Sequence, residues 1–156
     1  RAMRMPVEGT VAVGELKIDD HLHEGTVDGE HAAALPAVDE TGAPMTLDAE
    51  FLARGQVRYG IYCTPCHGAA GAGNGMVVQR GMLQPPALND ERLLSMNVGY
   101  FYDVIKNGVR NMPPYASQIP VRDRWAIAAY VRVLQRSQYA TIDDVPQEQR
   151  SEKGWK

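Results

Sequence analysis

The stretch Cys63-Thr64-Pro65-Cys66-His67 is the most informative part of this 156-residue sequence. Two cysteines separated by two residues, with a histidine directly after the second, are the arrangement that attaches a c-type haem. Both sulfurs form thioethers with the porphyrin, and a short helical turn then brings the imidazole under the iron. The sequence therefore predicts one covalently bound haem c, attached through Cys63 and Cys66, with His67 as the proximal iron ligand.

Other uses of a Cys-x-x-Cys pair fit the surrounding sequence less well. A thioredoxin-like redox pair needs a βαβ context, whereas the flanking residues indicate a helix, a glycine-rich loop and another helix. A structural zinc site needs four ligands, and the chain has no third cysteine. The glycine-rich loop is preceded by no strand and followed by no Gly-Lys-Ser/Thr, so it is a poor phosphate loop. Thiol redox chemistry is kept as the alternative to haem attachment.

Composition and charge restrict the class of protein. With 44% apolar and 22% charged residues, the balance is that of an ordinary soluble domain. A net charge of −3, made more negative by haem propionates, argues against a nucleic-acid partner. The longest apolar run, residues 125–131, is too short for a transmembrane segment. These observations favour a soluble chain without a nucleic-acid partner.

Haem chemistry also predicts where the chain works. Covalent attachment of haem implies export, so we expect the periplasm or the outer face of the bacterial cytoplasmic membrane. The chain begins at Arg1 with no initiator methionine and no signal-like apolar segment. We therefore expect an upstream leader, linker or membrane anchor to have been removed or left out.

Three parts follow from the pattern along the chain. Residues 1–45 lack helical periodicity and contain scattered glycine and proline, which predicts an irregular extension that wraps the core or contacts partners. Residues 46–138 contain the motif and the helical patterns, and so form the haem domain. The acidic and polar residues 139–156 are expected to form a loosely ordered tail.

Three histidines in the extension offer another ligand set. His21, His23 and His31 could offer metal ligands or a second haem ligand. Because acidic residues surround them, we interpret them as solvated loop residues.

A first helix is predicted from about residue 48 to Tyr59, with Thr46 as its N-cap. Gly55 lies on its apolar face, where glycine is less favourable than alanine by about 1 kcal/mol. We therefore expect another helix to approach closely at Gly55.

The last helix is predicted to begin at Pro120 or Val121 and to continue to about Gln138. Its small alanines permit a close crossing with the first helix, which would place Tyr130 or Trp125 beside the tyrosine at the end of that first helix.

Between them, a short amphipathic helix is predicted from about Val98 to Asn107. Asn97 is placed to cap its start, and Gly108 is placed where a residue with positive φ often ends a helix.

Met112 is the predicted distal iron ligand. Pro113 favours an extended conformation at Met112, which can then project its thioether from the loop. It follows the motif histidine by 45 residues, so a whole helix can line the haem between the two ligands. Met76 and Met82 are too near the motif to reach the opposite face easily, while Met96 and a site without a protein ligand remain alternatives.

Further residues are candidates for the haem surroundings. A backbone carbonyl of Pro85 or Pro86 could accept a hydrogen bond from the other ring nitrogen of His67 and orient the imidazole. Candidate neighbours of the haem propionates are Arg80, Arg110, Tyr115 and Trp125.

Over residues 46–138, the order of parts resembles the class I cytochrome c family. The matching parts are Gly55 and Tyr59 in the first helix, Cys63-Thr-Pro-Cys66-His67-Gly68, Met112-Pro113 and Ala129-Tyr130. The resemblance implies an all-α, class I cytochrome c-like haem domain that transfers single electrons and is not itself an enzyme.

More narrowly, the chain resembles the monohaem cytochrome c subunit of bacterial alternative complex III. The resemblance is carried by residues 54–63, 84–86 and 114–130, and by residues 6–12 in the extension. It implies a subunit of a quinol-oxidising membrane complex in a respiratory chain, whose other subunits include a multihaem cytochrome. Electrons would pass toward a terminal oxidase or a soluble carrier.

Two other functions are kept open for the same motif. One is a free-standing soluble electron carrier. The other is a haem with an open sixth position that binds a gas or peroxide, although the sequence offers no obvious distal acid-base pair.

Overall fold

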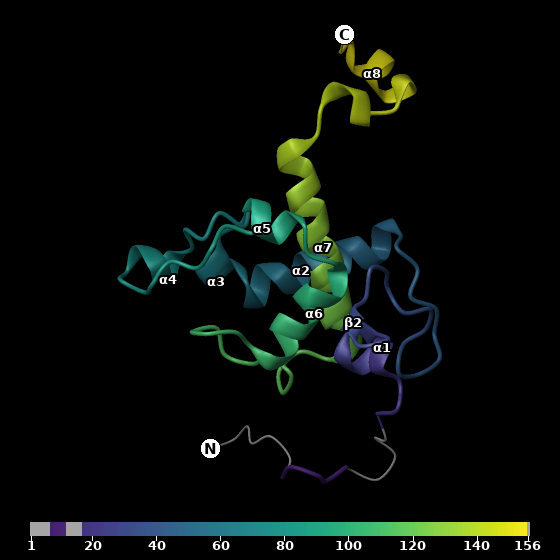
Figure 1. The fold of residues 1–156 in the computed structure, drawn as a ribbon. Helices are drawn as coiled ribbons and strands as arrows, with labels where there is room; N and C mark the ends of the chain where they lie inside the picture. Colours follow the sequence, from purple (N-terminus) through teal and green to yellow (C-terminus); the bar gives the residue numbers. More distant parts are fainter. Residues whose placement is uncertain (1–6, 12–16, 156) are drawn as a thin grey trace.

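The computed structural model describes residues 7–11 and 17–155. Residues 1–6 and 12–16 of the predicted extension and Lys156 of the tail lie outside these described residues. The elements in chain order are α1 (Asp20–Glu24), β1 (Thr26–Val27), β2 (Glu30–His31), α2 (Ala49–Tyr62), α3 (Thr64–His67), α4 (Met76–Gln79), α5 (Glu91–Leu94), α6 (Val98–Asn107), α7 (Val121–Tyr139), η1 (Ile142–Asp144) and α8 (Gln147–Lys153). The strands β1 and β2 form one short antiparallel hairpin. The fold is therefore helical, as predicted (Figure 1).

The crossing of α2 over α7 is the closest helix contact around which the domain is built. A Cβ atom placed on Gly55 would lie 2.1 Å from the carbonyl oxygen of Ala126, so a residue with a side chain does not fit there. One turn later, the rings of Tyr59 and Tyr130 lie 5.5 Å apart. The close approach at Gly55 and the pairing with Tyr130 are confirmed.

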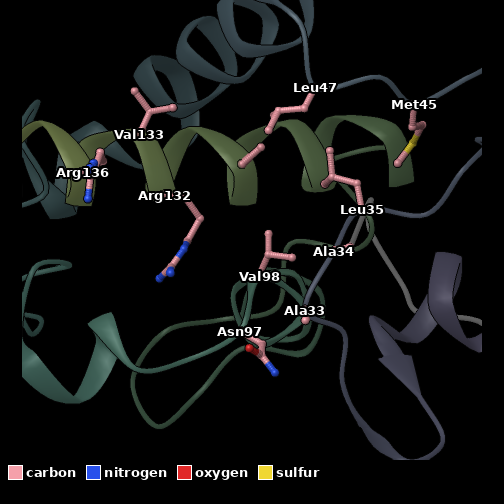
Figure 2. A pocket seen from close by; sticks show the side chains of 11 residues that line it. Ala33, Ala34, Leu35, Met45, Leu47, Asn97, Val98, Arg132, Val133 and Arg136 are labelled. Carbon is pink, nitrogen blue, oxygen red and sulfur yellow. The ribbon is translucent and has the colours of Figure 1, made fainter. Parts of the chain in front are cut away.

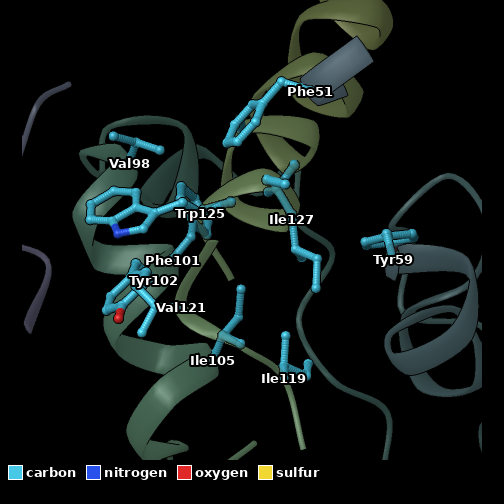
Figure 3. Packing of buried hydrophobic residues seen from close by; sticks show 14 of the residues in the cluster. Phe51, Tyr59, Val98, Phe101, Tyr102, Ile105, Ile119, Val121, Trp125 and Ile127 are labelled. Carbon is cyan, nitrogen blue, oxygen red and sulfur yellow. The ribbon is translucent and has the colours of Figure 1, made fainter. Parts of the chain in front are cut away.

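Trp125 takes a different place from the one expected beside Tyr59. Its ring stacks on Tyr102 of α6, with centroids 4.4 Å apart, and its Nε1 donates to the carbonyl of Leu22 at 3.0 Å. Figure 3 shows this ring among side chains of α6 and α7, away from Tyr59. Trp125 therefore joins α7 to α6 and to the N-terminal segment.

The boundaries of the main helices agree closely with the sequence pattern, with one correction at the start of α2. The N-cap is Asp48, whose side chain accepts from the backbone N–H of Phe51 at 2.8 Å, and not Thr46. Asn97 occupies the N-cap position of α6, as expected, but its side chain makes no capping bond and instead donates to the carbonyl of His31 at 3.0 Å. Gly108 ends α6 with φ of 75°, as expected.

The sequence does not predict α1, because a helix of five residues is too short to show periodicity. Asp19 caps it by accepting from the N–H of Leu22 at 3.0 Å. After this helix the chain packs on α6: a Cβ atom on Gly99 would lie 2.1 Å from the carbonyl oxygen of Gly25. The N–H of Gly99 also donates to Ala32 at 2.9 Å. The N-terminal segment thus completes the core on this side.

The interpretation of the three histidines as solvated loop residues is wrong. Two of them belong to α1: Nε2 of His21 lies 2.9 Å from the carbonyl of Ala34, and Nδ1 of His23 is buried. His31 lies in β2, with Nε2 3.4 Å from a carboxylate oxygen of Asp103. All three are half-buried, because the segment that carries them packs on the core. Among the described residues, no group of three or more His, Cys, Asp or Glu side chains forms a metal site.

Beyond α7, the tail contains η1 and α8, which project away from the helical body (Figure 1). Arg136 at the end of α7 pairs with Asp144 of η1. In the described part of the chain, no helix has both the length and the apolar composition needed to cross a bilayer.

Candidate haem site

The motif lies on a helical turn that continues α2. The N–H of Cys63 donates to the carbonyl of Tyr59 at 2.9 Å, while the carbonyl of Cys63 accepts from Cys66 at 3.1 Å and from His67 at 2.8 Å. Pro65 suits the first turn of α3, because a backbone N–H at this position would have no hydrogen-bond partner within the helix. These bonds hold the two sulfurs and the imidazole in one compact turn.

The glycine-rich loop closes tightly against this turn. The N–H groups of Gly73 and Gly75 donate to the carbonyls of His67 and Cys66, at 2.8 and 3.0 Å. A Cβ atom on Gly75 would lie 2.2 Å from the carbonyl oxygen of Pro65, so the approach requires glycine. The loop therefore buttresses the motif through its backbone.

The predicted attachment and ligand residues line one cavity of about 760 Å³. The wall is formed by helices α2, α3, α5, α6 and α7 and by the two loops before α5 and after α6. Cys63, Cys66, His67 and Met112 all face it, as do Pro85, Pro86, Arg110 and Tyr115. Outside the motif, the charged side chains among the described lining residues are two arginines. No described lining residue is a carboxylate.

His67 has the environment of a metal ligand. Its Nδ1 is buried and has no hydrogen-bond partner among the described residues. Burial lowers the pKa of His67, which favours the neutral imidazole that binds metals. Two cysteines and a neutral imidazole that face one cavity are the donor set that a covalently attached haem requires. The residues present therefore fit a haem.

The expected hydrogen bond from His67 to Pro85 or Pro86 is not formed. Both prolines line the cavity, but the carbonyl oxygen of Pro85 lies against Gly73, at 2.3 Å from a Cβ atom built there. Nδ1 of His67 has no hydrogen-bond partner among the described residues, so neither proline carbonyl bonds to it.

The cysteines have little of the character of a thiol redox pair. Both are free and half-buried. Burial, followed by the nearby Cys66, raises the pKa of Cys63 to about 12. Reactive cysteines usually have a lowered pKa, because the thiolate is the attacking species. The environment thus disfavours disulfide exchange.

The loop that carries Met112 is anchored on α6. The backbone groups of Val109 and Met112 bond to each other at 2.9 and 3.0 Å, and the N–H of Tyr115 donates to the carbonyl of Ile105 at 3.0 Å. A Cβ atom on Gly108 would lie 2.5 Å from the carbonyl oxygen of Met112, which keeps the turn narrow. A side chain projecting from this loop is therefore well positioned.

The other methionines differ from Met112 in position. Met82 also lines the cavity, but its sulfur lies 3.9 Å from the sulfur of Cys66, beside the attachment point. Met76 and Met96 are not among the residues that line the cavity. Met112 thus stays the favoured distal ligand, with Met82 as its nearest competitor.

Two predicted haem neighbours lie elsewhere. Trp125 is fully buried against Tyr102, and the exposed Arg80 follows α4 outside the lining. The sequence pattern missed Arg92 and Tyr100, which do line the cavity. The hydroxyl of Tyr100 raises the pKa of Arg92, which indicates that the two side chains meet. Helical spacing could have indicated Tyr100, but no local signal identified Arg92.

A second cavity of about 580 Å³ lies on the other face of α7. Residues of α7, among them Arg132 and Arg136, line it together with residues 33–35 of the N-terminal segment (Figure 2). It contains none of the motif residues.

The comparisons with known proteins agree with this geometry. The profile of the family described as "Cytochrome C oxidase, cbb3-type, subunit III" matches residues 50–131, which is more than half of the chain and includes the motif and Met112. The chain belongs to this cytochrome c family. The family implies electron transfer by a c-type cytochrome with covalently bound haem c. A search of curated proteins finds no match.

Two solved structures are similar to this chain. A chain of the reducing HAO-like protein complex of Kuenenia stuttgartiensis is 21% identical with a TM-score of 0.50, and the match covers 67% of this chain and 52% of that chain. This cytochrome thus spans about half the length of that relative. Cytochrome cL of the marine methylotrophic bacterium Methylophaga aminisulfidivorans is also 21% identical, with a TM-score of 0.46 over 65% of this chain and 73% of that chain. The predicted class I cytochrome c-like fold is confirmed by the helical structure and the family match.

Proposed function

We propose that this chain is a monohaem cytochrome that carries one electron at a time, without itself catalysing a reaction. Cys63 and Cys66 would hold the haem by thioethers, with His67 and Met112 as axial ligands. The observation that carries the proposal is that all four side chains line one cavity, whose described lining includes two arginines and no carboxylate. A bound haem c would supply a one-electron ferric/ferrous couple.

The chain's own residues would tune and protect that couple. Buried apolar side chains such as Phe101, Ile105 and Ile127 exclude water and favour the less charged, reduced form. A thioether ligand from Met112 would also raise the reduction potential. With both axial positions filled, oxygen and peroxide would find no open site.

The arginines and tyrosines of the lining suit the propionate groups. Arg92 and Arg110 are exposed where they meet the cavity, and Tyr100 and Tyr115 are half-buried beside it. Guanidinium groups bind carboxylates through paired, charge-assisted hydrogen bonds. We assign these residues to the propionate edge, with Arg92 and Tyr100 replacing Arg80 and Trp125.

We further propose that the cytochrome is a subunit of a quinol-oxidising membrane complex of the alternative complex III type. The sequence resemblance at residues 54–63, 84–86 and 114–130 supports this assignment. The complex would lie at the periplasmic or outer face of the bacterial membrane and include a multihaem cytochrome. The subunit would attach through its partners or an upstream anchor, and pass electrons toward a terminal oxidase or a soluble carrier of the respiratory chain.

The visible spectrum of the purified native protein tests the haem assignment. We expect one covalently attached haem per chain, with a methionine-sulfur charge-transfer band in the ferric form and no change when carbon monoxide is added to the ferrous form. Met112→Ala should lose the band and bind carbon monoxide. Met76→Ala is the matched control, because Met76 is exposed and does not line the cavity.

Other outcomes separate the alternatives. If Met82→Ala loses the band and Met112→Ala keeps it, Met82 is the ligand. High-spin native iron that binds carbon monoxide would instead favour a gas or peroxide site. Loss of colour after acid and solvent extraction of the matured protein would overturn the haem proposal.

The assignment to a complex has its own test. Quinol added to solubilised native membranes should reduce this cytochrome only while it copurifies with a multihaem subunit. Reduction of the free protein alone would favour a soluble carrier.

A further inference from the structure

Gln135 is a polar residue on the buried face of α7. It is 3% exposed, and its helix neighbours Val131 and Leu134 belong to the apolar core. A buried amide costs free energy unless its hydrogen-bonding groups have partners. Gln135 does not line the haem cavity, so any influence on the haem must pass through the residues to which it bonds.

Both ends of the Gln135 amide have partners. Its Nε2 donates to the carbonyl oxygens of Leu88 at 2.6 Å and Leu93 at 3.3 Å, while its Oε1 accepts from Nη1 of Arg132 at 2.6 Å. A guanidinium only donates and a carbonyl only accepts, so these partners allow a single orientation of the amide. Ionised glutamate could not donate to the two carbonyls, and lysine could not accept from arginine. The site is therefore suited to glutamine.

The two carbonyls lie on either side of Arg92 in the chain. Leu88 precedes α5, and Leu93 lies within α5, which packs beside α7 (Figure 1). All three residues, Leu88, Arg92 and Leu93, line the haem cavity. One buried amide of α7 thus holds the backbone of this part of the cavity wall on both sides of its arginine.

Leu88 also connects this attachment to the motif. Its N–H donates to the carbonyl of Gly71 in the glycine-rich loop at 2.7 Å. A Cβ atom on Gly71 would lie 3.0 Å from Cδ1 of Leu88, so the two segments are in close contact. The same loop bonds to the carbonyl of His67. Leu88 is therefore the point at which α7 and the loop after the motif are joined.

Arg92 depends on its backbone for its position. Its side chain is exposed and belongs to no ion pair among the described residues. It meets the hydroxyl of Tyr100, which lines the same cavity. A long exposed side chain with few fixed contacts follows the backbone that carries it. The bonds of Gln135 to that backbone consequently decide where the guanidinium can lie.

We propose that Gln135 is a positioning residue that holds Arg92 at the propionate edge of the haem and Leu88 in the cavity wall. This inference rests on the proposed haem function. Without the amide, the two carbonyls lose their donor, and the backbone between them shifts toward water. A nearby cation and a dry cavity both disfavour the more positive ferric haem. Loss of Gln135 therefore lowers the reduction potential.

A redox titration of the holoprotein measures this role. Gln135→Leu keeps a side chain of similar size and removes its hydrogen bonds. At the midpoint potential of the unsubstituted protein, we expect the ratio of reduced to oxidised protein to fall about threefold, which is about 30 mV for a one-electron couple. The methionine-sulfur band should remain, because Met112 lies on a different loop. An unchanged midpoint in the folded variant would overturn the proposal.

Gln138→Leu is the matched control. Gln138 lies one turn farther along α7 and bonds to the side chain of Asn89 at 2.7 Å and to the carbonyl of Ala70 at 2.9 Å, but it is exposed. Because water can replace these bonds, the ratio should stay within about 20% of that of the unsubstituted protein. A decrease equal to that of Gln135→Leu would contradict a specific role for the buried amide.

A double-mutant cycle tests whether Gln135 acts through Arg92. Arg92→Gln should lower the same ratio about twofold in the unsubstituted protein, because it removes the cation. In the Gln135→Leu background, the arginine is already displaced, so the further decrease should be less than about 1.3-fold. Equal decreases in the two backgrounds would show that the residues act independently, and would overturn the positioning role.

Amide hydrogen exchange provides a test that needs no variant. In the unsubstituted holoprotein, the N–H groups of Leu88, Leu93 and Leu94 should exchange within about tenfold of those of α7, although they belong to a loop and a four-residue helix. Exchange as fast as in exposed turns would reject the attachment. The visible spectrum is recorded first. Absence of a c-type spectrum rejects the haem proposal, whereas a normal spectrum with fast exchange rejects only the role of Gln135.

Discussion

The two sides of α7 are built on different principles. At the crossing with α2 and beside α6, α7 is packed without space, as Gly55 against Ala126 and Trp125 against Tyr102 show. One face of the same helix, which includes Ile127, instead lines a cavity of about 760 Å³. The comparison indicates that the packed side holds the helices in place, so that the other side can stay open for a ligand.

This separation gives different expectations for the two sides. A substitution on the packed side should lower stability and leave the spectrum of the properly matured protein unchanged. A substitution such as Met112→Ala should change the spectrum with a smaller effect on folding. The three predictions that follow test the packed side in decreasing order of effect.

Trp125→Ala should have the largest effect on stability. It removes a fully buried ring, its stacking on Tyr102 and its hydrogen bond to Leu22, and should reduce the free energy of unfolding by about 3–5 kcal/mol. Denaturant unfolding measures the loss. Because Trp125 does not line the cavity, the absorption spectrum of the folded fraction should not change. A shifted methionine-sulfur band would show that the two sides are coupled.

Gly55→Ala should destabilise the protein by about 2–3 kcal/mol, because the new methyl group meets the backbone of α7. The matched control is Gly60→Ala on the same helix. A Cβ atom on Gly60 meets nothing within 4 Å, so this substitution should stabilise the protein by about 0.5–1 kcal/mol through helix propensity. Similar results for the two variants in thermal unfolding would contradict the crossing geometry.

Asp39 should contribute a smaller, pH-dependent stabilisation. Its carboxylate accepts hydrogen bonds from the hydroxyl and N–H of Thr41 and from Arg122 of α7, and these bonds lower its pKa from 3.8 to about 2. A lowered pKa in the folded protein means that the stabilisation is present above pH 3.8 and is lost as the pH falls toward 2.

We expect this contribution to be on the order of 1 kcal/mol, since part of the site is screened by water. Unfolding of the unsubstituted protein and of Asp39→Asn, measured over this pH range, should differ most near neutral pH and converge near pH 2. A constant difference at all pH values would show that the charge of Asp39 is not involved.

Much of the helical framework could be predicted because its signals are local. The span of α6 follows from apolar spacing between Asn97 and Gly108, and a glycine on an apolar face indicated the crossing at Gly55. The five-residue α1 could not be predicted in this way, because its Leu22 is buried by distant parts of the chain. The cap of α2 is Asp48 and not Thr46. The sequence could not separate the two, because both residue types are adequate N-caps.

The candidate site also has a part that the local sequence predicts and a part that it does not. The spacing of Cys63, Cys66 and His67 is itself the chemical requirement of thioether attachment and ligation, so the sequence alone indicates it. The surroundings are assembled from distant segments. Arg92 and not Arg80 lines the cavity, and Trp125 packs away from it, because the direction of a side chain depends on how its helix is rotated against its neighbours.

The sequence by itself thus determined the chemistry and the main helices, because covalent spacing and helical periodicity act over a few residues. Only the tertiary structure decided that Met112 shares one cavity with His67 and that α1 completes the core. Those properties depend on contacts between residues far apart in the chain, and such contacts are set by packing and ion pairing in three dimensions.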